Sequence, residues 1–148
     1  FSWMEVGSSS AAPIIAYQRP KNSGSQTAME NMVMKGLRFV DVEDNYITDG
    51  MSDLVRQVGD YTNSEEALGY SFLYYLNNLY VNENIKVLAV DGVYPSTENL
   101  QSGTYPLTAN YYAVYLKGDT EAEAFVQWLL SDEGQKCVEQ AGYIPVGN

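Results

Sequence analysis

The sequence predicts an α/β fold in which helices flank a mixed, mostly parallel sheet. Two features of the chain support this prediction. Short apolar runs with strand character alternate with segments in which apolar residues recur at helical spacing. The chain has 148 residues, of which 45% are apolar, and this is enough for one compact domain with a core of its own.

The N-terminal part of the chain is expected to form a strand, a turn and a helix in succession. Residues 1–12 form a lead-in segment, and residues 14–17 are an apolar and aromatic run between two prolines, which is typical of a buried strand. The polar residues 19–24 follow. From Ser25 onward, apolar residues recur at helical spacing as far as Gly36, a typical helix stop.

The middle of the chain continues this alternation. An acidic loop over residues 41–50 precedes a short predicted helix that ends at Gly59. Residues 67–72 have the composition of a strand and lead into a tyrosine- and leucine-rich helix over residues 74–80. Residues 85–90 form a clearer predicted strand, which an Asp-Gly turn closes.

The C-terminal part carries the strongest helical signals. Residues 96–100 favour one helical turn, and residues 105–116, rich in Tyr, Val and Thr, are predicted as a longer strand. Asp119 is a typical N-cap for a helix with an acidic first turn. A further helix is expected to begin at Ser131 and to stop at Gly142.

Side chains of these two C-terminal helices are expected in the core. Phe125 and Trp128 share one helix face, and Trp128 is predicted to be buried there. Cys137 lies on the apolar face of the last helix and is interpreted as a small buried hydrophobic side chain. It is the only cysteine, so cysteine usage leaves the cellular compartment undecided.

Charge and composition exclude several classes of function. The net charge of −11, from 19 acidic and 8 basic residues, opposes binding to nucleic acid or to an anionic membrane surface. No apolar run approaches the roughly 20 residues that span a bilayer, so no direct membrane insertion is expected. The absence of histidine removes Ser-His and Cys-His catalysis and the HExxH zinc site. We therefore predict no catalytic residue and no cofactor.

The acidic loop is also not expected to bind a metal ion. Its Asp-x-Glu-x-Asn start resembles a calcium loop, but Tyr46 occupies the glycine position and Ser52 the position of the bidentate glutamate. A solvated loop is the better interpretation.

The residues between the first strand and the first helix carry the chemistry. Helix N-termini bind anions because their first backbone N–H groups lack partners and the helix dipole is positive there. Ser23 and Ser25 add hydroxyl donors, and Gly24 lets a ligand approach the backbone. Arg19 supplies a planar, permanently charged fork that suits two oxygens of a phosphate-like group.

A structural interpretation of the same residues stays open. The stretch from Ser23 to Gln26 reads S-x-x-Q, which is a capping box that helices use without any ligand. From the residues alone, an anion site and a helix cap are both consistent with this segment.

Several motifs resemble one family of transport receptors. Arg19-x-x-x-Ser23-Gly24-Ser25 is similar to the R-x-x-x-S-G-T motif of the phosphate-binding (PstS-like) receptors of ABC transporters, in the type 2 periplasmic-binding-protein superfamily. Other segments match in order and spacing: residues 3–7 (N-W-x-E-V-G), 67–70 (A-I-G-Y), 105–108 (Y-P-L-T), 125–135 (F-L-S-x-E-G-Q) and 142–146 (G-Y-x-P-L).

The resemblance implies a fold and a set of contacts. In this family two α/β lobes close around an anion, so residues 13–148 are expected to form one lobe, with the first lobe upstream of residue 1. Phosphate contacts are implied for Arg19, Ser23, the backbone amide of Gly24, and Ser25. Ser25 replaces the usual Thr, and Lys21 stands where some members carry an acidic residue. The preferred ligand therefore stays open among phosphate, sulfate and a phosphorylated organic molecule.

The function implied is non-catalytic. The resemblance indicates a solute-binding protein, extracellular or periplasmic and in some forms lipid-anchored, that captures inorganic phosphate and delivers it to an ABC permease. The alternative is an interaction or sensing module of the same fold in which the loop is only a helix cap. A hydrolase using Ser23 is disfavoured because the chain offers no general base of the usual kind.

Overall fold

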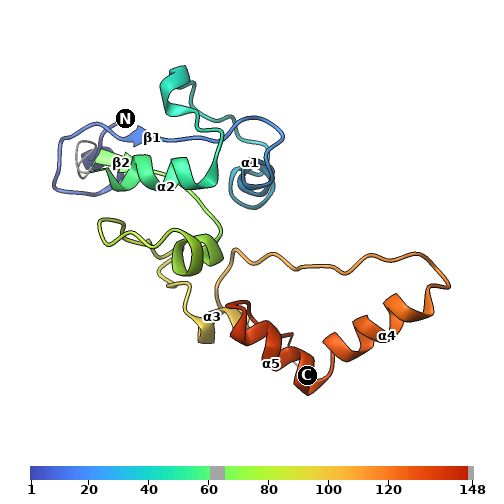
Figure 1. Ribbon diagram of the computed structural model, residues 1–148. Coiled ribbons are helices and arrows are strands. Elements are labelled where there is room, and N and C mark those ends of the chain that lie inside the picture. The colour runs from blue at the N-terminus through green and yellow to red at the C-terminus, as the bar shows by residue number, and fades with distance from the viewer. Residues whose placement is uncertain (61–65, 147–148) are drawn as a thin grey trace. The chain divides into compact units, whose positions relative to one another are not determined.

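The computed structural model describes residues 1–60 and 66–146. The chain divides into two compact units, Phe1–Lys86 and Val87–Asn148 (Figure 1). The first unit combines helices with a small parallel sheet, which agrees with the predicted fold class. In the described part of the chain, no helix is long and apolar enough to cross a membrane.

The sheet of the first unit joins two of the predicted strands. β1 (Ile15–Ala16) pairs in parallel with β2 (Ala67–Leu68), and the Tyr17 N–H extends the ladder by donating to the Leu68 carbonyl at 2.8 Å. A parallel bridge between Gln18 and Ile47 adds the acidic loop to the far side of β1. Both strands lie where the sequence predicts them, but they are shorter than expected.

The helices of this unit also follow the sequence. α1 (Gly24–Met29) continues as a π-helical turn (Glu30–Met34), and the left-handed Lys35 (φ +46°) and Gly36 (φ +91°) terminate it. α2 (Met51–Gly59) ends at the predicted glycine. The described residues of this unit also form two 3-10 helices, Trp3–Val6 and Asp44–Tyr46, and a π-helical turn, Tyr75–Leu79.

A small core lies between α2 and the sheet. Tyr17 on the β1 side and Leu54 and Val55 on α2 are the buried apolar side chains of the described residues. Gly69, just after β2, faces α2 so closely that a Cβ there would overlap the Leu54 and Val58 side chains. The glycine therefore allows α2 to pack on β2.

Within residues 87–146, three helices each begin with a side-chain cap, and the cap at Asp119 is the one that the sequence predicts. Ser96 accepts from Asn99 N–H at 3.2 Å at the start of α3 (Thr97–Gln101). Asp119 accepts from Ala122 N–H at 3.0 Å at the start of α4 (Thr120–Leu129), and Ser131 caps α5 (Asp132–Gln140). Because a cap is a local hydrogen bond, the sequence alone predicts it.

Two predicted strands of the second half are wrong. Residues 85–90 and 105–116 form no strand among the described residues, where only an isolated bridge joins Val90 to Val93. Both segments have strand composition, but a strand requires a neighbour to pair with, and propensity reports only how well a segment fits a sheet. The described residues supply no such neighbour.

The predicted burial in the last two helices is also wrong. Phe125 is 59% exposed and Trp128 is 42% exposed, although they share one helix face as predicted. Cys137 is exposed as well. Helical periodicity identifies a face that can be buried, but burial depends on another element that covers it.

Candidate functional site

The candidate site lies at the carboxyl ends of the two parallel strands. Arg19 follows β1 and Tyr70 follows β2, so the pairing brings these two residues to one edge of the sheet. The backbone N–H of Arg19 donates to the Tyr70 hydroxyl oxygen at 3.0 Å. This bond holds the start of the Arg19 loop against the second strand.

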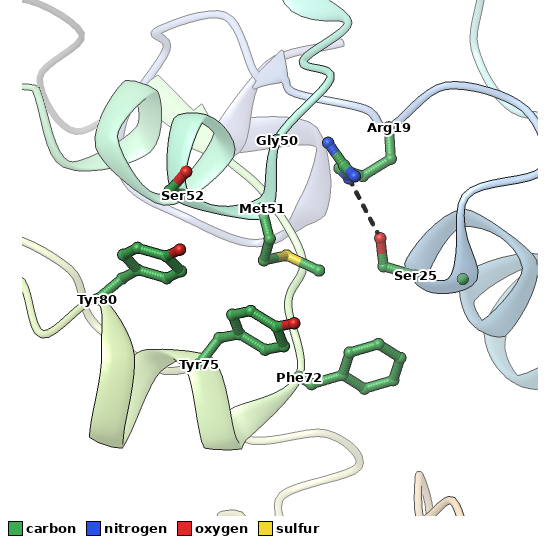
Figure 2. Close-up of a pocket in the computed structure, with 9 residues that line it drawn as sticks. Arg19, Ser25, Gly50, Met51, Ser52, Phe72, Tyr75 and Tyr80 are labelled. Carbon is green, nitrogen blue, oxygen red and sulfur yellow. Dashed lines mark hydrogen bonds between the residues drawn. The ribbon is translucent and has the colours of Figure 1, made fainter.

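The Arg19 side chain is held by two further groups. Its Nε–H donates to Ser25 Oγ at 3.4 Å (Figure 2), and its Nη1 donates to the backbone carbonyl of Thr48. Ser25 and Thr48 are each 6% exposed, so both anchors are buried. A guanidinium carries five N–H donors, and these contacts leave some of them available in a fixed orientation.

No carboxylate in the described chain neutralises this arginine. The ion pairs of the described residues join Arg38 to Asp41 and Arg56 to Asp53, all of them on exposed side chains. The positive charge of Arg19 is therefore uncompensated, which favours an anion beside it.

The start of α1 offers backbone donors next to this charge. Ser23 is the N-cap and its Oγ accepts from Gln26 N–H at 3.3 Å. Within the described residues, the N–H groups of Gly24 and Ser25 have no hydrogen-bond partner. These two amides and the dipole of the helix point to an anion site in the same place as the arginine.

The capping-box interpretation is only half correct. Ser23 caps the helix, but its own N–H donates to the Pro20 carbonyl at 3.1 Å instead of to Gln26. The Gln26 side chain, in a residue that is 4% exposed, accepts from the Tyr70 hydroxyl. Gln26 thus connects α1 to β2, and the Ser23 hydroxyl hydrogen is not required for the cap.

Burial affects the protonation of the Tyr70 hydroxyl that makes this hydrogen bond. It raises the pKa of the Tyr70 phenol above its ordinary value of 10.0, while the hydrogen bond from the Arg19 backbone and the charge of Arg19 act in the opposite direction. Tyr70 therefore stays a neutral O–H donor at neutral pH, as its bond to the Gln26 carbonyl oxygen requires.

An open cavity of about 440 Å³ joins these groups, within the first unit (Figure 2). Three of the four predicted site residues line it, and Ser23 lies outside the lining as the helix cap. The lining consists of the anion corner (Arg19, Gly24, Ser25), the N-terminal end of α2 (Gly50, Met51, Ser52) and an aromatic wall (Phe72, Tyr75, Tyr80).

Sequence reasoning missed several of these residues. The sequence does not single out Ser52 as a binding residue, although Ser52 lies in the first turn of α2, and the start of this helix is recognisable from the sequence. Tyr75 and Tyr80 stack with ring centroids 5.9 Å apart. The sequence favours packing for these tyrosines over a ligand-stacking surface, and it does not show that they lie beside Arg19.

Known proteins with similar sequences identify the family to which this chain belongs. Residues 2–133 match the PBP superfamily domain, and the chain belongs to this family. It is 30% identical over 98% of its length to the phosphate-binding protein PstS of Bacillus subtilis, and it covers 45% of that protein. It is 31% identical over 97% of its length to the phosphate-binding protein PstS 2 of Streptococcus agalactiae, and it covers 50% of that relative.

Solved structures agree with this assignment. A phosphate ABC transporter substrate-binding protein from Clostridium perfringens, with bound phosphate, matches 99% of this chain with a TM-score of 0.73 and 28% identity, over 57% of its own chain. The PstS structure from Borrelia burgdorferi has a TM-score of 0.71 at 20% identity over 99% of this chain and 58% of its own, and it supports the fold alone. The chain spans about half the length of the curated relatives it matches.

Proposed function

We propose that this chain is the phosphate-binding part of a solute-binding protein of a phosphate ABC transporter, and that it binds inorganic phosphate without catalysis. One observation supports this function above all. Among the residues that the structure describes, an arginine without a carboxylate partner is fixed beside the free N–H groups of Gly24 and Ser25, in one open cavity. The relatives with similar sequence carry the name phosphate-binding protein.

The binding step follows from these contacts. On binding, phosphate exchanges its hydrating water molecules for hydrogen bonds from groups of the protein. The proposed donors are the Arg19 guanidinium, the two amides and the Ser23 and Ser25 hydroxyls. The net charge of −11 does not oppose this step, because salt screens exposed charges beyond about 8–10 Å while the donors act at contact distance.

The proposal includes the rest of a longer protein. In this proposal residues 13–148 form the second lobe, and residues 1–12 lead into it. A first lobe supplies the remaining contacts when the two lobes close on the anion. The parent protein works outside the cytoplasm, with or without a lipid anchor, and passes phosphate to its permease. Since this chain covers about half the length of its relatives, it alone is expected to bind weakly.

Calorimetric titration of the protein at the full length of its relatives tests this function. Phosphate should bind, sulfate serves as the control ligand, and Arg19→Ala should weaken phosphate binding by about 100-fold or more, because charge-assisted bonds are lost. Arg38→Ala removes an exposed arginine of the same unit and should leave affinity unchanged. If phosphate does not bind to the full-length protein, or if Arg19→Ala binds as tightly, the proposal is wrong.

A second candidate rests on the Ser23 cap. The bond from Gln26 N–H to Ser23 Oγ is what a purely structural helix start requires, so the module could serve interaction or sensing instead. Arg19→Ala separates the two. Loss of phosphate binding in this variant of the full-length protein would favour the phosphate site, whereas a full-length protein that binds its partner but no phosphate, with or without Arg19, would favour the structural cap.

A further inference from the structure

Asn22, between Arg19 and the start of α1, has an uncommon backbone conformation. Its φ is +71°, in the left-handed region that most residues other than glycine avoid. Asn22 is exposed, and within the described part of the chain its side chain makes no hydrogen bond or ion pair. The backbone angle, and not a side-chain contact, therefore distinguishes this position.

Asn22 occupies the third position of a β-turn over residues 20–23. The Ser23 N–H donates to the Pro20 carbonyl at 3.1 Å and closes this turn. Lys21, at the second position, has a negative φ, because the described non-glycine residues with a positive φ do not include it. A negative φ followed by a positive one matches a type II turn, whose third position favours Gly or Asn. Asparagine meets this requirement at low cost, since it tolerates the left-handed conformation better than most side chains.

The turn determines how Arg19 and Ser25 meet. The Arg19 Nε–H donates to Ser25 Oγ at 3.4 Å, and this bond closes a loop that contains the whole turn (Figure 2). The loop is anchored on both sides, because the Arg19 N–H donates to the Tyr70 hydroxyl and Ser23 caps α1. A change of the backbone angle at Asn22 must therefore move the start of α1 relative to the arginine.

We propose that Asn22 is a positioning residue of the anion site: its left-handed backbone places the first amides of α1 where they and Arg19 can contact one anion. This inference rests on the proposed function. A residue that resists the left-handed conformation lets the exposed turn relax, and the donors then no longer converge. Phosphate affinity falls in proportion to the population of the competent turn, while the rest of the protein stays folded.

A graded series at position 22 tests the inference in the protein at the full length of its relatives. Tolerance of the left-handed conformation decreases from Gly and Asn through Ala to the β-branched Val. In calorimetric titration, Asn22→Gly should bind phosphate within about 3-fold of the wild-type affinity. Asn22→Val should bind about 10-fold or more weakly, with Asn22→Ala between the two.

Lys35 provides the matched control. It is also exposed and left-handed, with a φ of +46°, but it follows the far end of the same helical segment and is outside the described lining of the cavity. Lys35→Val introduces the same backbone conflict away from the site, and Lys35→Gly removes the same charge without the conflict. These two variants should bind phosphate equally well. If Lys35→Val weakens binding as much as Asn22→Val does, the effect is a general loss of stability and the inference is wrong.

Hydrogen exchange gives a readout that needs no ligand. The Ser23 amide, whose bond to the Pro20 carbonyl closes the turn, should exchange about 10-fold or more faster in Asn22→Val than in the wild-type protein. Asn22→Gly should keep the wild-type protection. Unchanged exchange in Asn22→Val would contradict the role of Asn22 in the turn.

The titrations also separate this inference from the proposed function. Wild-type phosphate binding that Asn22→Val does not weaken would overturn the inference alone. A full-length wild-type protein that binds no phosphate would overturn the proposed function, and the inference with it.

Discussion

Arg19 is oriented by groups that come from three separate parts of the chain. Ser25 on α1 and Thr48 in the loop before α2 hold its guanidinium, and Tyr70 after β2 holds its backbone. Thr48 is itself fixed, since its N–H donates to the Gln18 carbonyl at 2.9 Å. The arginine is thus preorganised before any ligand arrives, which reduces the entropy lost on binding.

Tyr70→Phe is expected to destabilise the protein. The change removes the O–H donor to the buried Gln26 side chain and the acceptor for the Arg19 N–H. Leaving buried polar groups unsatisfied costs about 1–3 kcal/mol, which urea unfolding monitored by circular dichroism would detect.

Tyr112→Phe provides the matched control for this prediction. Its side chain is 80% exposed, and the free energy of unfolding should change little. If the two variants have the same stability, the Tyr70 hydroxyl does not contribute as proposed.

Deprotonation of the Tyr70 phenol is expected to lower the stability of the protein at alkaline pH. Burial raises the pKa of Tyr70 in the folded state above its ordinary value of 10.0, and burial also raises the pKa of Tyr105. Because the folded-state pKa is the higher one, the stabilising contribution is complete below the unfolded pKa and is lost as pH rises through the folded pKa. Stability measured by urea unfolding should therefore be lower above about pH 10.5 than at pH 7.

Tyr70→Phe also tests this pH dependence. The variant lacks the titrating phenol, so its stability should fall less than that of the wild-type protein as pH rises from neutrality. A parallel decline of the two proteins across this range would show that other groups cause the alkaline loss.

At the level of elements, the contact between α4 and α5 depends on one glycine. Gly134, in the first turn of α5, is buried against the carbonyl groups of Trp128 and Leu129, and a Cβ there would overlap both. The Gln135 side chain adds to this corner by donating to the Leu129 carbonyl at 2.7 Å. The turn between the helices therefore tolerates no side chain at this position.

Gly134→Ala should lower the stability of the protein by about 2 kcal/mol, because overpacking against backbone atoms cannot be relieved by a side-chain rotation. Thermal unfolding measures this change. The matched control is Gly24→Ala at the start of α1, where a Cβ would meet no atom within 4 Å. That variant should keep its stability, and an equal loss in both would show that the close approach of the Trp128 and Leu129 carbonyls is not the cause.

At the level of the whole molecule, the exposed apolar residues are unevenly distributed. The core of the first unit is small but contains buried tyrosine, leucine and valine. The second unit exposes the apolar side chains of residues 111–116 and one face of α4.

The sequence by itself determined the local features of this protein. The cap at Asp119, the helix starts at Ser96 and Ser131, the helix stop at Gly36, and the order of strand, turn and helix around Arg19 all depend on residues close together in the chain. The physical basis of each is a hydrogen bond or a backbone angle within a few residues. The family resemblance was equally visible, because it rests on motifs in order along the chain, and the match to the PBP superfamily domain confirms it.

Only the tertiary structure decided what lies across space. It pairs Gln26 with Tyr70 instead of completing a capping box, and it brings Ser52 and the tyrosine wall beside Arg19. Within residues 1–60 and 66–146, it also leaves residues 105–116 without a sheet partner. Each of these outcomes depends on whether two segments far apart in the chain come into contact. Periodicity and propensity describe single segments, so they do not encode which distant segments meet.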